Sequence, residues 1–394
     1  MSDWWTTIAL PVIAFMRRQN YPAASLDAYA LFWRNEILPL LGPCTTPVVY
    51  PSWITDDHTP VEFSVVLGSG TRSVLRFSFE PSALPLAGDR SLATLKRTLE
   101  RLGCALTMES TLDLEWFDIC ADELLLGESQ ERVCTDQAPV SETSIGIDLA
   151  HRSANIKVYF MPRIRSLISQ ELPEDMISRT TERLGLHKPW AAILQFLSRF
   201  SPADRPNIDI VAIDCVPASR NRLKIYFRTD IASYAQMEYF LTLGGVLATQ
   251  DIGAGLRNAT LIWDTLTSVS ENGNALLGKA SGFPGALIYY ELKHGADVPS
   301  SKVYLPVHRY FRDDLVISRA VAHLASKLPD VSSVAKGYPD FIQETFPYRS
   351  LSSRTGIHTY VACTVKPGGS DVSVYYNPES FAPERTRKQL RSLL

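Results

Sequence analysis

The segment Arg-Leu-Lys-Ile-Tyr at residues 222–226 alternates cationic or aromatic side chains with apolar ones. A period of two predicts a β-strand with one cation-and-phenol face, because successive side chains of a strand point to opposite sides of its sheet. Its core, Lys-x-Tyr, occurs again at residues 157–159 and 302–304. A solvated strand face would explain any single copy. Three copies instead indicate a repeated unit whose polar faces line one lumen if the sheet closes.

Similar alternation appears along most of the chain, mainly in consecutive pairs of segments joined by short polar turns such as 68–70 and 368–369. The expected strands are 61–67, 74–79, 144–148, 156–161, 208–215, 222–228, 287–292, 302–307, 359–365 and 372–377. Helical periodicity separates the pairs, most clearly over residues 26–38, 92–102, 190–200 and 315–328.

Paired strands alternating with helices do not follow the one-strand, one-helix rhythm of a parallel sheet. They favour antiparallel hairpins added one after another, and about ten such strands curl or close, with helices packed outside. The predicted fold class is therefore α+β, with an antiparallel β-sheet surrounded by α-helices. Because no linker rich in Pro, Gly or Ser divides the chain, we expect a single domain over residues 1–394.

Charge and cysteine usage limit the classes of partner. The net charge of −3 argues against nucleic acid or an acidic membrane as a partner for the whole surface. The six cysteines form no CxxC pair, so they predict neither a zinc site nor a disulfide framework, but reduced thiols in a cytoplasmic protein. The apolar stretch 7–16 precedes its basic residues and is too short to span a bilayer, so we expect an amphipathic helix there rather than a targeting signal.

A lumen lined by lysines and tyrosines suits one kind of ligand. Gathered cations repel one another unless an anion lies among them, and a diphosphate is the natural candidate. Tyrosine faces stabilise a neighbouring cation and shield it from water. An allylic diphosphate becomes an anion and a carbocation as its C–O bond breaks. The sequence has neither a DDxxD cluster nor a phosphate-binding loop of the GxxxxGK[ST] type, so we expect no metal and no cofactor.

An acidic residue lies beside this chemistry. Residues 55–64, Thr-Asp-Asp-His-Thr-Pro-Val-Glu-Phe-Ser, lead into the first expected strand and place Glu62 among apolar neighbours. A carboxylate there could accept a hydrogen bond from a ring N–H or a phenolic O–H; the alternative is an exposed strand glutamate. Arg76, on the paired strand, is a further candidate phosphate ligand.

Several of these motifs together resemble a known family. Residues 55–64, Arg-Phe-Ser-Phe-Glu-Pro at 76–81, Lys-Val-Tyr-Phe-x-Pro at 157–162, residues 222–226 and Lys-x-Tyr-x-Pro at 302–306 are similar, in order, to the fungal aromatic prenyltransferases of the dimethylallyltryptophan synthase type. The resemblance implies a closed ten-stranded antiparallel barrel of ααββ repeats. It also implies metal-independent transfer of a dimethylallyl group from dimethylallyl diphosphate to an indole-containing or related aromatic acceptor, in alkaloid secondary metabolism.

The resemblance also assigns roles to single residues. Glu62 corresponds to the acceptor of the indole N–H bond. The implied diphosphate ligands are Arg76, Lys157, Arg222, Lys224 and Lys302. The implied tyrosine shield is Tyr159, Tyr226, Tyr304 and Tyr375, with Tyr376 and Tyr360 as competitors of Tyr375 for the last place.

One position departs from the family pattern. Tryptophan-specific members are expected to carry a lysine shortly after an Asp-Leu pair, as the base for the ring proton. Here Asp148-Leu149 is followed by Ala150 and His151. Either His151 replaces that base, or another ring position reacts, or His151 is only a turn residue.

The partners expected are dimethylallyl diphosphate and an aromatic small molecule, with a homodimer left open. Tryptophan, an indole-containing cyclic dipeptide, an indole alkaloid and a phenolic polyketide remain alternatives as acceptor. A non-catalytic barrel that binds a phosphorylated metabolite is the competing hypothesis, because fold alone does not fix function.

Overall fold

The computed structural model describes residues 4–45, 48–67, 74–86, 91–106, 112–126, 142–249, 251–269, 283–328, 335–367 and 369–385. Among the features expected from sequence, the turn at 68–70, Gly368 and Cys134 lie outside these ranges.

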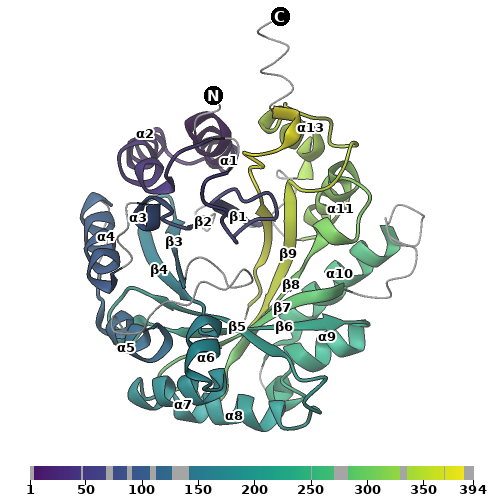
Figure 1. Cartoon of the computed structure of the whole chain (residues 1–394). Coiled ribbons are helices and arrows are strands. Elements are labelled where there is room, and N and C mark those ends of the chain that lie inside the picture. Colours follow the sequence, from purple (N-terminus) through teal and green to yellow (C-terminus); the bar gives the residue numbers. More distant parts are fainter. Residues whose placement is uncertain are drawn as a thin grey trace, which may run out of the picture.

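Ten strands form one closed antiparallel barrel, in the order β1-β10-β9-β8-β7-β6-β5-β4-β3-β2 (Figure 1). Each strand pairs with its neighbours in the chain, and β1 closes the barrel on β10 through pairs such as Ser64 with Tyr375. The strands are β1 Val61–Leu67, β2 Leu75–Phe79, β3 Thr143–Leu149, β4 Ala154–Phe160, β5 Asn207–Asp214, β6 Leu223–Ile231, β7 Phe283–Leu292, β8 Ser300–Leu305, β9 His358–Val365 and β10 Val372–Tyr376. The expected barrel and all of its expected strands are confirmed.

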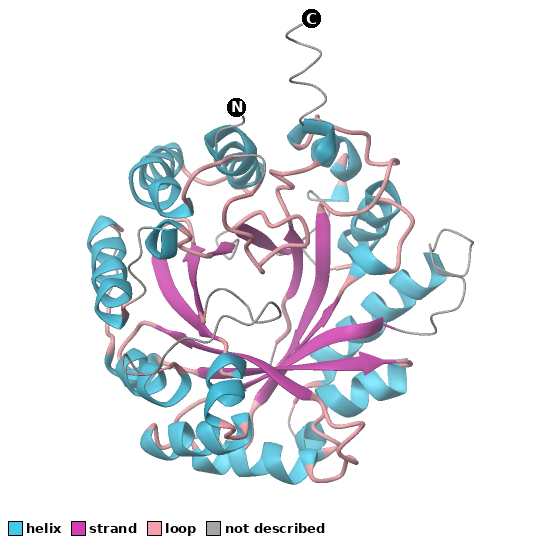
Figure 2. Cartoon of the chain, viewed as in Figure 1, coloured by secondary structure: helices cyan, strands magenta, loops and turns pink. Residues whose placement is uncertain are grey.

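Helices surround the barrel on its outside (Figure 2). The longer ones are α1 Leu10–Arg18, α2 Ala23–Phe32, α4 Leu92–Ala105, α5 Glu115–Leu124, α6 Arg163–Ser169, α7 Pro173–Arg183, α8 His187–Leu197, α9 Tyr234–Leu241, α10 Gly253–Val269, α11 Asp314–Lys327 and α13 Tyr338–Thr345. Side-chain caps begin several of them: Asp313 accepts a hydrogen bond from the backbone of Val316, and Ser91 from that of Thr94. No described helix combines the length and the hydropathy that crossing a membrane requires.

The helix expected over 26–38 is divided in the structure. It consists of α2 followed by a π-helical turn, Trp33–Ile37, and a 3₁₀ turn, Leu38–Leu41. The expected helices at 92–102, 190–200 and 315–328 correspond to α4, α8 and α11. Helices α5, α6, α7, α9, α10 and α13 were not among the predicted segments.

The two faces of the barrel wall form two separate cores. Leu223, Ile225 and Phe227 of β6 belong to the large apolar layer between the barrel and its helices. Tyr226, from the same strand, belongs instead to a small cluster inside the barrel with Tyr289 and other residues. The alternation read from the sequence therefore separates an apolar outer face from a cationic and phenolic inner face.

A buried ionic network joins α11 to the start of β9 and to the segment after β10. Arg349 Nη2 lies 2.5 Å from an Asp314 oxygen and 2.8 Å from a Glu379 oxygen, and these three side chains are at most 3% exposed. Asp314 also accepts from His358 Nδ1 and from the backbone N–H of Ile357. Breaking a buried pair by removing one partner leaves an uncompensated charge.

We therefore expect Arg349→Met to lower the free energy of unfolding by about 3–5 kcal/mol. The matched change Lys96→Met breaks the exposed Lys96–Asp118 pair, whose side chains are 37% and 52% exposed, and should cost less than about 1 kcal/mol. Urea unfolding of both variants measures the difference. Equal costs would show that the buried network does not stabilise the fold.

Candidate active site

Three buried lysines and a half-buried arginine lie inside one end of the barrel, where the even-numbered strands begin. Lys157, Lys224 and Lys302 are 5%, 5% and 2% exposed, and each points inward from its strand. Arg76 occupies the second position of β2 in the same phase. Arg222, immediately before β6, joins them through shared carboxylate partners. We call this group of five, Arg76, Lys157, Arg222, Lys224 and Lys302, the cation layer; all five were predicted as diphosphate ligands.

Three carboxylates from the odd-numbered strands, which end at the same place, accompany the cation layer. Asp148 lies 2.5 Å from Lys157 Nζ and 3.5 Å from Arg76 Nε. Asp214 pairs with Arg222 and lies 3.6 Å from Lys224 Nζ. Glu291 lies 3.1 Å from Arg222 Nη1. Sequence reasoning missed all three, although each occupies an inward position at or next to the end of its strand.

Burial sets the charge state of the layer. Burial, together with the neighbouring charge of Arg222, lowers the pKa of Lys224 to about 7, against the opposing attraction of Asp214. Burial likewise holds the pKa of Lys302 well below its usual range, with Arg76 adding to the effect. For Asp214, burial opposes ionisation, but the charges of Lys224, Lys157 and Arg222 outweigh it and keep the pKa low. An anion bound to the cation layer would therefore favour the protonated form of both Lys224 and Lys302.

Tyrosine rings follow the cations, two residues further along the strands. The Tyr159 and Tyr226 centroids are 6.4 Å apart, those of Tyr226 and Tyr304 6.0 Å, and those of Tyr304 and Tyr375 5.3 Å. Lys302 Nζ lies 4.8 Å from the Tyr304 centroid and donates a hydrogen bond to the Tyr375 hydroxyl at 3.1 Å. The structure thus gathers the four predicted shield residues and places the cation layer directly beside them.

The two competitors of Tyr375 differ in position. Tyr376 points outward, where its hydroxyl forms a hydrogen bond with that of Tyr338. Tyr360 lines the pocket described below, but its ring also packs against the tyrosine cluster, with its centroid 6.2 Å from that of Tyr304 and 6.3 Å from that of Tyr375. One shield residue was missed: the Tyr289 ring lies 5.1 Å from that of Tyr226. Period-two alternation could have found it, because Tyr289 shares its phase with the inward Glu291.

Space for these rings depends on small inward residues. A Cβ atom at Gly146 would lie 2.7 Å from Cε2 of Tyr159. Only glycine therefore lets the Tyr159 ring lie against β3 where it does.

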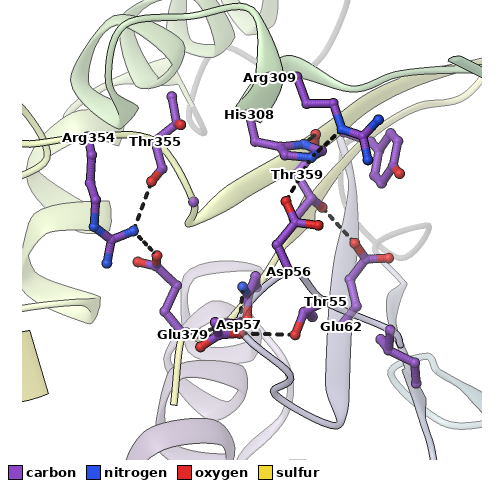
Figure 3. Close-up of a pocket in the computed structure, with 14 residues that line it drawn as sticks. Thr55, Asp56, Asp57, Glu62, His308, Arg309, Arg354, Thr355, Thr359 and Glu379 are labelled. Carbon is purple, nitrogen blue, oxygen red and sulfur yellow. Dashed lines mark hydrogen bonds and ion pairs between the residues drawn. The ribbon is translucent and has the colours of Figure 1, made fainter. Parts of the chain in front are cut away.

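The opposite end of the barrel holds Glu62 in the wall of a cavity of about 320 Å³ (Figure 3). Glu62 Oε1 accepts a hydrogen bond from the Thr359 hydroxyl at 2.7 Å. Burial raises the pKa of Glu62 to about 8, so this carboxyl group can both accept and release a proton near neutral pH. His308 lines the same cavity and lies 2.8 Å from the Thr359 carbonyl through Nδ1 and 3.3 Å from Asp56 through Nε2.

The Asp57 carboxylate accepts the hydrogen bonds that hold the loop at residues 55–60 in place. One of its oxygens accepts from the Thr55 hydroxyl and from Asn377 Nδ2, both at 3.0 Å, and the other from the Thr59 hydroxyl at 3.0 Å. The backbone N–H of Phe381 also donates to it at 3.1 Å. Asp57 therefore ties the loop before β1 to the segment after β10, and the Asp56 side chain remains 75% exposed at the pocket.

His151 lies away from Glu62. It occupies the turn between β3 and β4, where its ring centroid lies 4.5 Å from that of Tyr21 and its carbonyl accepts from the Ser25 hydroxyl. Leu149 pairs with Leu75, at the end of the barrel that holds the cation layer, whereas Glu62 pairs with Ser78 nearer the other end. The geometry favours the turn-residue interpretation of His151. His308, Arg309 and Asp56, which do lie with Glu62, were not predicted as site residues.

Comparison with known proteins gives a consistent result. The profile of the family described as tryptophan dimethylallyltransferase matches residues 1–340. The 4-O-dimethylallyl-L-tyrosine synthase of Claviceps purpurea is 30% identical over 96% of this chain and 88% of its own length. The 7-dimethylallyltryptophan synthase of Aspergillus fumigatus is 24% identical over 95% of this chain and 84% of its own.

Solved structures share the fold. The crystal structure of NotF in complex with brevianamide F and DMSPP superposes with a TM-score of 0.81 at 24% identity, over 96% of this chain and 94% of that one. The crystal structure of AnaPT from Neosartorya fischeri superposes with a TM-score of 0.81 at 23% identity, over 95% of this chain and 93% of that one.

The low pKa of Lys224 makes a prediction about anion binding. Because a bound diphosphate raises that pKa, binding takes up a proton above about pH 7 and weakens as the pH rises. Lys224→Arg, which stays charged, lacks this dependence. We expect the ratio of the Kd for inorganic diphosphate, wild type over Lys224→Arg, to rise between pH 6 and 9, by at most about tenfold per pH unit.

Calorimetric titrations at several pH values measure this ratio. The ionisation of diphosphate itself cancels in it, because both proteins bind the same ligand. A ratio that is constant over this range would show that Lys224 is already fully charged in the empty barrel.

Proposed function

The chain belongs to the tryptophan dimethylallyltransferase family and is an aromatic prenyltransferase, and from this premise we propose how its barrel performs the reaction. A dimethylallyl group passes from dimethylallyl diphosphate to an indole-containing or related aromatic acceptor, without a metal ion. The observation that carries the proposal is the order of groups along the lumen: cations, then tyrosine rings, then the Glu62 carboxyl group.

The cation layer binds the diphosphate of the donor. Its five cations face three carboxylates, Asp148, Asp214 and Glu291. When Lys224 and Lys302 are protonated, the layer therefore carries two more positive than negative charges. An anion offsets this surplus, and buried Lys and Arg interact strongly with phosphate oxygens. The same ligands stabilise the diphosphate as it leaves, because negative charge grows on it when the C–O bond breaks.

The tyrosines receive the other fragment. The electron pair of the broken C–O bond goes to the diphosphate oxygen, and the dimethylallyl cation remains beside Tyr159, Tyr226, Tyr304 and Tyr375. Their ring faces attract a cation and exclude water that would otherwise capture it. Tyr289 extends this shield on the same side of the lumen.

Glu62 orients the acceptor. An aromatic nucleophile attacks the cation, a new bond forms to the dimethylallyl carbon, and a base takes the proton that the acceptor loses. For an acceptor that reacts through its own N–H or O–H, the ionised Glu62 carboxylate is that base. The Glu62 carboxylate accepts a hydrogen bond from the acceptor N–H or O–H, which raises the electron density of the ring. Relatives named for tyrosine, which has a phenolic O–H, and for tryptophan, which has an indole N–H, support both kinds of hydrogen-bond donor on the acceptor. The proposal gives His151 no part in the proton transfer.

The proposal also includes the domain organisation, the location and the oligomeric state of the chain. Residues 1–394 act as one domain, supported by closure of the barrel between β1 and β10. A cytoplasmic location is supported by the free thiols of Cys44, Cys104, Cys120, Cys215 and Cys363. Whether the chain forms a homodimer is left to measurement.

The activity has a direct test. Purified protein incubated with dimethylallyl diphosphate, a panel of indoles and phenols, and EDTA should release diphosphate and form a prenylated product. A barrel that only binds phosphorylated metabolites would bind the donor without releasing diphosphate. Absence of product with every acceptor, or loss of activity with the chelator, would contradict the proposal.

Glu62 can be tested separately. Glu62→Gln keeps the size of the side chain but removes the basic carboxylate, so kcat should fall about 100- to 10,000-fold while the Kd for the donor stays near that of the wild type. Glu100→Gln, the same change at an exposed glutamate of α4 outside the barrel, is the matched control and should leave kcat near that of the wild type. Unchanged turnover in Glu62→Gln would remove Glu62 from the mechanism.

A further inference from the structure

The three carboxylates beside the cation layer lie directly opposite cations of the neighbouring strands. The opposed residues in the register of the barrel are Arg76 with Asp148, Lys157 with Asp214, and Lys224 with Glu291. Side chains that lie directly opposite each other in an antiparallel pair point to the same face of the sheet. The strand pairs β2–β3, β4–β5 and β6–β7 therefore each place one cation and one anion side by side in the lumen.

The fourth strand pair, β8–β9, breaks this pattern. Lys302 lies opposite Thr364, so a hydroxyl group occupies the position that a carboxylate holds in the other three pairs. In the part of the chain that the structure describes, Lys302 forms no ion pair, and its Nζ donates to hydroxyl groups instead. The carboxylate that attracts it, Asp371, is itself paired with Lys366 at 2.8 Å. The positive charge of the layer is therefore least compensated at Lys302.

Asp214 interacts with more members of the cation layer than the other two carboxylates do. One of its oxygens pairs with Arg222, and the other, Oδ1, lies 3.6 Å from Lys224 Nζ and 3.9 Å from Lys157 Nζ. The side chain is 4% exposed, and Oδ1 has no hydrogen-bond donor among the described residues. Charge rather than hydrogen bonding therefore relates Asp214 to both lysines, and the same charge would act on any anion bound between them.

The donor and the product diphosphate differ in charge. When the C–O bond breaks, its electron pair stays on the diphosphate oxygen, so the product has one more negative charge than the donor when both are fully ionised. The five cations therefore attract the product more strongly than the donor, and the three carboxylates repel it more strongly. The carboxylates thus cancel a large part of the preference that the cations alone would give to the product.

We propose that Asp148, Asp214 and Glu291 determine specificity between donor and product, by weakening the binding of released diphosphate more than that of the donor. The uncharged Thr364, opposite Lys302, leaves the layer enough positive charge to bind the donor. This proposal rests on the proposed prenyl transfer and adds the release of its leaving group. A purely structural role predicts the opposite effect, because removing a carboxylate would then leave a cation misplaced and weaken the binding of every anion.

The test changes the charge of the layer in both directions. Asp214→Asn removes one carboxylate, Thr364→Asp adds a fourth one opposite Lys302, and Thr364→Asn is the uncharged match of the second change. All variants are made in the Lys224→Arg background, because arginine stays charged when a neighbouring carboxylate is removed. Calorimetry at one pH measures the Kd of inorganic diphosphate and the Kd of a non-hydrolysable thio-analogue of dimethylallyl diphosphate.

We expect Asp214→Asn to lower the Kd of diphosphate about 10- to 100-fold and that of the thio-analogue less, because the repulsion grows with the charge of the ligand. Thr364→Asp should raise both constants, again with the larger effect on diphosphate, whereas Thr364→Asn should leave their ratio unchanged. Asp214→Glu, which keeps the charge, should give a ratio near that of the parent protein. Asp118→Asn, in an exposed ion pair of α5, is the matched control and should not shift the ratio.

Weaker binding of both ligands to Asp214→Asn, or an unchanged ratio of the two constants, would overturn the proposal and leave the carboxylate a structural counter-ion. Thermal unfolding checks the fold of each variant. If Asp214→Asn does not fold, Thr364→Asp decides, because an unchanged ratio in that variant contradicts the proposal equally. Both constants are measured without turnover, so a failure of prenyl transfer with every acceptor would be recognised separately from a failure of this proposal.

Discussion

The central constraint on this structure is that three lysine side chains are buried, beside two half-buried arginines, at one end of a closed barrel. Charges taken out of water are costly unless they are paired, and like charges at short range repel. Asp148, Asp214 and Glu291 offset part of that cost, but burial and the neighbouring charge of Arg222 still hold the pKa of Lys224 below its usual range. The lumen is therefore poised for an anion, and the remaining features of the site are arranged around the place where that anion would lie.

Antiparallel topology turns one short repeat into a layered site. Because every even-numbered strand starts at the same end of the barrel, Lys-x-Tyr places its cation near that end and its phenol one step deeper. Strand β10 has the same alternation, but Ser373 occupies the position of the cation and Tyr375 follows two residues later. The odd-numbered strands run the other way and contribute carboxylates where they end. Helices outside the wall leave the inner face free to carry this chemistry.

The strands and the cation layer were predictable because both depend on local alternation. The Lys-x-Tyr copies are periodic, so their shared face and approximate depth follow from the geometry of a strand. Helix α10 was harder to foresee, since it begins with Gly253 and Gly255, which are poor helix formers. Gly255 is required for packing: a Cβ atom there would lie 2.9 Å from Cα of Val365 in β9.

The acceptor end was not predictable for a different reason. Asp56, His308 and Thr359 come from distant parts of the sequence, and only closure of the barrel and the hydrogen bonds of Asp57 bring them together around Glu62. The counter-ions of the cation layer likewise depend on which residues become neighbours across strands.

The most direct measurement is a crystal structure with a non-hydrolysable thio-analogue of dimethylallyl diphosphate. We expect its diphosphate among Arg76, Lys157, Lys224 and Lys302, with the dimethylallyl chain against the rings of Tyr159, Tyr226, Tyr304 and Tyr375. A diphosphate bound at the Glu62 end, or outside the barrel, would contradict the assignment of the lumen.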